Sequence, residues 1–134
     1  MPFDMTPTYA IETIDQKAFL SPINQVREAN GLWPVKWRPD LVCVAQAQAD
    51  ILKPPVTPVA ACNHGNFSWR VSQCQAQAYG EVLTCNFPDL ESAVRGLFTS
   101  PSHVKIIMTP EYTRAGVGFA KNGPYTTIVF TFGY

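Results

Sequence analysis

The two histidines are the residues of this 134-residue chain whose chemistry is most distinctive. His64 lies in the segment CNHGNF, and His103 lies in SPSHVKIIM, two residues after a proline. An imidazole changes charge near neutral pH, so it can move a proton or bind a metal ion. Two interpretations are open from the residues alone. Either the two rings meet in one site, or His64 occupies an exposed turn and His103 only the first turn of a short helix.

Four cysteines, Cys43, Cys62, Cys74 and Cys85, lie in the middle of the chain. Their spacing contains no CxxC pair, which weakens a structural zinc interpretation. An even number suits two disulfides in an oxidising compartment, and buried reduced thiols are the alternative. Four cysteines allow three pairings. We favour Cys62–Cys74, because that pair brackets the irregular segment that carries His64.

Composition limits the classes of partner. Ten basic residues balance ten acidic ones, so the charge gives no case for binding nucleic acid or an anionic membrane. Apolar residues make up 46% of the chain, enough for the core of one domain, and no apolar run is long enough to cross a bilayer. The start, MPFDMTPTYA, lacks the features of a signal peptide. We therefore expect any export signal to be absent from this sequence.

Apolar residues at helical spacing predict several helices. The first covers residues 21–30 with Ser21 as its cap, or it begins upstream near Asp15 and bends at Pro22. The second begins at Pro39 and ends near Lys53. Two more are predicted over residues 88–100 and 102–108, and the first half of segment 68–85 suits a short helix.

The remaining segments predict a connector and a hairpin. In LWPVKW, Pro34 disfavours helix, and we expect Leu32, Trp33 and Trp37 to be buried. RAGVGFAK and YTTIVFTFGY are rich in β-branched and aromatic residues and flank NGP, which is typical of a β-hairpin. Helices precede strands, so the fold class is α+β, with helices packed on an antiparallel sheet.

The order of these motifs resembles the CAP superfamily (cysteine-rich secretory proteins, antigen 5 and pathogenesis-related group 1), and in particular its compact bacterial branch. The matching motifs are Asn30-Gly31-Leu32, Pro34 to Trp37, His64-Gly65, Gly80-Glu81, Ala93 to Leu97, Ser100 to His103, and Gly116-Val117-Gly118 before a closing aromatic strand. The resemblance implies a three-layer α-β-α sandwich with an antiparallel sheet, whose third strand lies near Glu81. It implies one domain over residues 14–134, preceded by an extended segment over residues 1–13.

The resemblance also implies that His64, Glu81 and His103 gather in one cleft. These three residues are the candidate catalytic set, if any activity exists, and the candidate ligands of Zn²⁺ or another divalent cation. Val82 replaces an asparagine of the family motif, and Ser100 takes the place of a second acidic residue, which weakens a tight metal site. Candidate binding residues around the cleft are Tyr79, Trp69, Asn63, Ser100 and Ser102. Arg27 and Arg70 are expected to be solvated surface charges.

Two functions follow from the resemblance. The first is a secreted or periplasmic, monomeric binding module for a small apolar ligand, a divalent metal or a protein partner, with no nucleic-acid partner. The second is a metal-assisted peptidase or esterase in which Glu81 is the general base. We favour the first, because the missing second acid removes an acid–base partner.

Overall fold

The structure is a computed structural model, and it describes residues 18–134. The predicted extended segment 1–13 and the start of the first helix lie outside the described residues. In chain order the elements are a helix over residues 18–29, β1 (Lys36–Trp37), α2 (Pro39–Ile51), a 3₁₀ turn (Val59–Ala61), α3 (Phe67–Gln73), β2 (Gly80–Phe87), α4 (Leu90–Leu97), α5 (Pro101–Ile107), β3 (Arg114–Asn122) and β4 (Tyr125–Gly133).

The four strands form one sheet in the order β1-β3-β4-β2. The predicted hairpin is confirmed as β3 and β4, and β2 is the expected third antiparallel strand. The sheet is mixed, however, because β1 pairs with β3 in parallel. Two residues are too few to show strand alternation in a sequence, so β1 was not predicted. β2 is an edge strand, so one of its two sides has no neighbouring strand.

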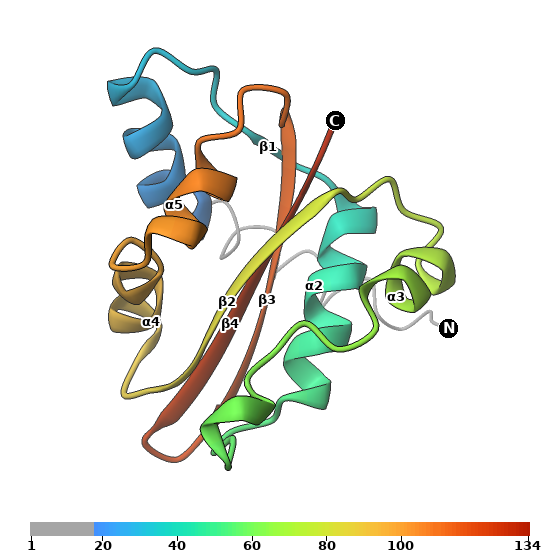
Figure 1. The fold of residues 1–134 in the computed structure, drawn as a ribbon, viewed down its shortest axis with the longest axis vertical. Coiled ribbons are helices and arrows are strands. Elements are labelled where there is room, and N and C mark those ends of the chain that lie inside the picture. The colour runs from blue at the N-terminus through green and yellow to red at the C-terminus, as the bar shows by residue number, and fades with distance from the viewer. Residues whose placement is uncertain (1–17) are drawn as a thin grey trace.

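Helices cover both faces of the sheet, which confirms the three-layer arrangement. The helix 18–29, α4 and α5 lie on one face, and α2 and α3 lie on the other (Figure 1). Along β4 the buried residues alternate: Ile128 and Phe130 pack toward α4 and α5, and Val129 packs toward α2. A strand buried on both faces lacks the alternation of apolar and exposed polar residues, and residues 126–132 of β4, TTIVFTF, are all buried and include no charged residue.

The Gly116-Val117-Gly118 motif sets how closely α2 approaches the sheet. A Cβ on Gly116 would collide with the backbone of Leu41 and Val42, and a Cβ on Gly118 would collide with the backbone of α2 at Gln46. Val117 points to the opposite face, where it is fully buried. Two glycines spaced by two residues therefore let the backbone of α2 lie directly on β3.

Both pairs of cysteines are bonded, but the predicted Cys62–Cys74 pairing is wrong. Cys43 bonds Cys74 and joins α2 to the end of α3, while Cys62 bonds Cys85 and joins the loop before α3 to β2. The prediction failed because α3 packs back on α2, which brings Cys74 to Cys43 instead of to its neighbour in sequence. The two bonds indicate an oxidising compartment.

The helix over residues 18–29 includes Phe19 and Leu20, so Ser21 is not its cap and the helix begins upstream of Ser21. The predicted start near Asp15 lies outside the described residues. Trp33 differs from expectation, since its side chain is 82% exposed.

Within residues 18–134, no helix is both long and apolar enough to cross a membrane.

Candidate functional site

Glu81 lies on the edge strand β2 and points toward the layer of α2 and α3. Its neighbour Val82 packs into the core on the opposite face, so alternation along the strand turns the Glu81 carboxylate toward α3. Its side chain is only 2% exposed. Thr131, its partner across the strand pair, donates a hydrogen bond from Oγ1 to Oε1 at 3.0 Å. A carboxylate this deeply buried needs a cation beside it.

Arg70 is that cation, and it is as buried as its partner. One guanidinium nitrogen donates to Oε1 of Glu81 at 2.8 Å and the other donates to Oε2 at 2.7 Å, which is the two-pronged geometry that arginine favours with carboxylates. The same two nitrogens donate to the backbone oxygens of Val44 at 2.7 Å and His64 at 2.8 Å. Arg70 thus ties α2, the His64 loop and β2 together.

The expectation that Arg70 and Arg27 are solvated surface charges is wrong, since their exposed fractions are 1% and 0%. Residues 67, 70, 71 and 74 fall on one helical face, and the other three are Phe, Val and Cys. An arginine on an apolar helical face is the sequence signal that could have indicated its burial.

His64 completes the network from the loop before α3. Its Nδ1 lies 2.8 Å from Oε2 of Glu81, and its side chain is 45% exposed. Because the carboxylate oxygen accepts, Nδ1 carries the proton, and Nε2 of the neutral ring is left as an acceptor. The Cys62–Cys85 disulfide holds this loop against β2, two residues before the histidine.

The network keeps Glu81 ionised. Burial by itself raises the pKa of the Glu81 carboxyl, but hydrogen bonds from His64, Arg70 and Thr131 and the charge of Arg70 outweigh burial and hold it below the ordinary value. The two carboxylate oxygens accept two hydrogen bonds each, from Arg70 and Thr131 at Oε1 and from Arg70 and His64 at Oε2. A carboxylate stabilised in this way is a weak base.

His103 approaches from the other layer. It lies in the first turn of α5, and burial followed by the electrostatic effect of His64 lowers its pKa, against a backbone hydrogen bond at Leu97 that raises it. That His103 shares one cleft with His64 and Glu81 stays a prediction. Within the described residues, Nδ1 of His103 is buried and lacks a hydrogen-bond partner of ordinary geometry.

Comparison with known proteins agrees with this architecture. The family model of the cysteine-rich secretory protein family, CAP, matches residues 20–134. The chain belongs to the CAP family. An uncharacterized membrane protein, YlbC, of Bacillus subtilis is 27% identical to this CAP domain over 111 residues, which is 81% of this chain and 32% of that protein. The chain therefore spans about a third of the length of that relative.

Two solved structures share the CAP fold. An extracellular protein containing an SCP domain from Bacillus anthracis has a TM-score of 0.68 at 18% identity, over 97% of this chain and 44% of that one. An outer surface protein from Borrelia burgdorferi has a TM-score of 0.67 at 20% identity, over 87% of this chain and 90% of that one. At these identities the likeness shows the fold.

The three residues expected to bind a metal do not fit a metal site in this CAP domain. Among residues 18–134, no group of three or more histidine, cysteine, aspartate or glutamate residues lies close enough to hold an ion. Both oxygens of Glu81 are occupied by Arg70, whose positive charge also opposes a cation at the same place. Only the two imidazoles remain as donors, and two neutral ligands make a weak site.

The other candidate binding residues are spread around this region. Tyr79 and Trp69 are 54% and 55% exposed, and the Tyr79 ring stacks on Tyr134 with a centroid separation of 4.5 Å. The hydroxyls of Ser100 and Ser102 lie 2.9 Å apart. Asn63 shapes the His64 turn, since its Oδ1 accepts from the backbone N–H of Gly65 at 2.9 Å. Direct contact with a ligand stays a prediction for all five.

Proposed function

We propose that this CAP domain is an extracytoplasmic module that binds a small apolar ligand and does not catalyse a reaction. The observation that carries the proposal is an apolar pocket of about 540 Å³ between the helix 18–29 and α4. Its apolar lining consists of Ala18, Phe19, Pro22, Leu90, Val94 and Phe98. Pockets of this size and lining are typical of sites for small ligands.

The charges at this pocket lie at its rim. Glu91 and Arg95 line its edge and pair with one another at 2.9 Å on the exposed face of α4. A ligand with an apolar body and one polar end would place the body among the phenylalanines and the polar end beside Arg95. This chemistry favours a small amphiphile, such as a fatty acid.

The state of Glu81 argues against hydrolysis with this carboxylate as general base. Its pKa is lowered and its oxygens accept four hydrogen bonds, from Arg70 twice, His64 and Thr131. It has neither the basicity nor a free lone pair that abstracting a proton from water requires. In our proposal the His64–Glu81–Arg70 network has a structural role, because it holds the loop, α3 and the edge strand in place.

One observation favours a second candidate, hydrolysis with His64 as base. The bond from Nδ1 to Glu81 fixes the tautomer and leaves Nε2 on a half-exposed ring, as in histidines that act as general bases. The hydroxyls of Ser100 and Ser102, beside His103 in the sequence, bond to each other at 2.9 Å, so neither is bonded to a base that would activate it as a nucleophile.

Binding of a fluorescent fatty-acid analogue tests the first function. We expect Leu90→Arg, which places a charge at the half-buried pocket wall, to weaken binding about tenfold or more. Ile51→Arg is the matched control, because Ile51 is 65% exposed on α2, on the other face of the sheet, and should bind as wild type does. Equal affinity in all three proteins contradicts the assignment of the pocket. Thermal unfolding of each variant checks that the fold is intact.

Turnover assays separate the two functions. We expect wild type to show no hydrolysis of peptide or ester substrates above the uncatalysed rate. Turnover that His64→Gln abolishes without lowering the midpoint of thermal unfolding would contradict the binding function and support the second candidate. His64 is suited to this test because its half-exposed ring can be replaced without emptying the core.

A further inference from the structure

A second hollow lies at the opposite end of the helix 18–29, around Trp33. Trp33 is 82% exposed, which is more than any other large hydrophobic side chain in the described residues. An indole in water forgoes most of the stabilisation that burial would give it. A large aromatic side chain so exposed on an ordered segment is available to contact a ligand.

The segment that carries Trp33 is held rigidly from beneath. Nε of the fully buried Arg27 donates to the backbone oxygen of Trp33 at 2.9 Å, and its two terminal nitrogens donate to the backbone oxygens of Ile107, Thr109 and Tyr112 at 2.7–2.9 Å. The side-chain amide of Asn24 bonds both the N–H and the C=O of Val35, at 2.8 and 3.0 Å. The backbone of the segment that carries Trp33 is therefore fixed before a ligand binds.

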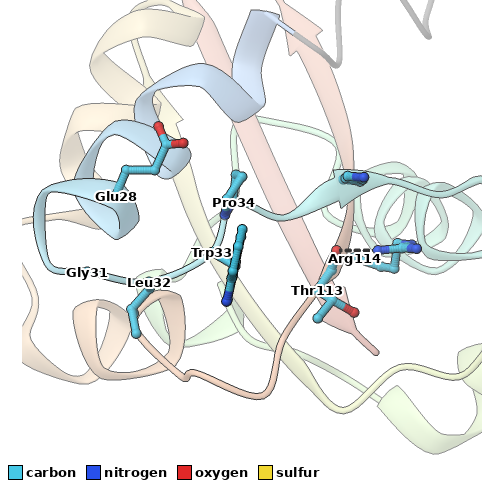
Figure 2. Close-up of a pocket in the computed structure, with 8 residues that line it drawn as sticks. Glu28, Gly31, Leu32, Trp33, Pro34, Thr113 and Arg114 are labelled. Carbon is cyan, nitrogen blue, oxygen red and sulfur yellow. Dashed lines mark hydrogen bonds between the residues drawn. The ribbon is translucent and has the colours of Figure 1, made fainter.

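Charged side chains flank the indole. The hollow has a volume of about 680 Å³, and Leu32, Trp33 and Pro34 supply its apolar wall. Figure 2 shows Glu28 on one side of Trp33 and Arg114 on the other. Lys36 also lines the hollow, so two cations and one carboxylate surround an exposed aromatic ring.

We propose that this hollow binds an acidic oligosaccharide through its uronic-acid units. The C–H face of a pyranose carries weakly positive hydrogens, which suit the electron-rich face of an indole. The carboxylate of the sugar would pair with Arg114 and Lys36. Glu28 would accept hydrogen bonds from the sugar hydroxyls.

This glycan site does not involve the His64–Glu81–Arg70 network or the apolar pocket between the helix 18–29 and α4. None of the residues that line it belongs to either of those sites. If the glycan proposal fails, the proposed binding of an apolar ligand is unaffected. If the apolar-ligand proposal fails, the glycan proposal is likewise unaffected.

The test is calorimetric titration of the whole chain with the hexamer of galacturonic acid. We expect binding by wild type, and a loss of about tenfold or more in Trp33→Ala. Tyr125→Ala is the matched control, because it removes an aromatic side chain that is 40% exposed and lies outside this hollow. The Lys36→Gln/Arg114→Gln double variant should also bind about tenfold more weakly, and its affinity should depend less on salt.

Two comparison ligands make the result decisive. The neutral hexamer of glucose should bind at least about tenfold more weakly than the galacturonic acid hexamer. A peptide of six glutamates should not bind measurably. Equal affinities of wild type and Trp33→Ala, or binding of the peptide as tightly as the acidic sugar, would overturn the proposal, since either result would mean charge attraction alone.

Discussion

Replacing Arg70 by methionine is the most informative perturbation of the network around Glu81. The change keeps much of the volume of the side chain, but it removes the guanidinium that bonds both oxygens of the carboxylate. Glu81 would remain as an unpaired charge with 2% exposure, and the backbone oxygens of Val44 and His64 would each lose a buried donor.

The structure sets the size of the expected loss. Arg70 donates four hydrogen bonds, two of them to a charged acceptor, and its guanidinium lies 5.4 Å from the ring centroid of Phe67. Removing one partner of a buried ion pair typically costs about 3–5 kcal/mol, because the remaining charge is left without compensation. That amount is a large share of the roughly 5–15 kcal/mol by which a domain is stable. We therefore expect a free energy of unfolding lower by about 3–5 kcal/mol.

The assay is urea denaturation followed by circular dichroism, under non-reducing conditions, as a double-mutant cycle. Glu81→Gln alone should destabilise by a similar amount, since it strands Arg70. The combined variant Arg70→Met/Glu81→Gln should lose less than the sum of the single variants by about 2 kcal/mol or more. Arg70→Lys keeps the charge without the two-pronged geometry and should fall between wild type and Arg70→Met.

The pH dependence gives a further check on the same variant. Without Arg70, only the hydrogen bonds from His64 and Thr131 oppose the effect of burial, so the pKa of Glu81 rises relative to wild type and the folded state takes up a proton at higher pH. The stability deficit of Arg70→Met should therefore shrink between about pH 7 and about pH 5. A loss below about 1 kcal/mol at pH 7, or strict additivity in the cycle, would refute the idea that this pair is one buried unit.

Three further predictions concern the disulfides, His103 and the glycine motif. Peptide mapping without reduction should recover the Cys43–Cys74 crosslink, and replacing both residues with serine should lower the free energy of unfolding by about 3–4 kcal/mol, given the separation of 31 residues. The pKa of His103 in the folded protein lies below 6.5, so the contribution of this residue to stability is full above about pH 6.5 and falls as the pH drops and the unfolded chain takes up the proton. His103→Gln should reduce this loss of stability at low pH, measured by urea titrations at several pH values. Gly118→Ala should destabilise by about 1–3 kcal/mol in the same assay, since its Cβ meets the backbone of α2.

The elements that local patterns specify were predictable from the sequence. The helix opened by Pro39 and the aromatic hairpin follow from spacing and turn residues alone, and the order of motifs was enough to place β2 around Glu81. The structure also joins His64 and Glu81 by a direct hydrogen bond, while the place of His103 in the same cleft stays a prediction.

What failed were long-range pairings. The partner of Cys74 depends on how α3 folds back on α2, which no local pattern specifies. Arg70 was misjudged because a charged residue is usually exposed, and only a buried acid elsewhere in the chain makes its burial favourable. Trp33 was predicted to be buried because it is apolar, but its side chain is exposed, and no pattern in the sequence distinguishes it from a core tryptophan.

Titration of the Glu81 carboxyl by NMR tests the role of the network most directly. With the side-chain carboxyl carbons labelled, the chemical shift of Glu81 reports its pKa while the protein stays folded. We predict a midpoint below the ordinary value of 4.5, because Arg70, His64 and Thr131 stabilise the carboxylate more than burial destabilises it. A midpoint raised toward neutrality, where a carboxylate can act as a general base, would contradict the structural role of Glu81 and favour an enzyme.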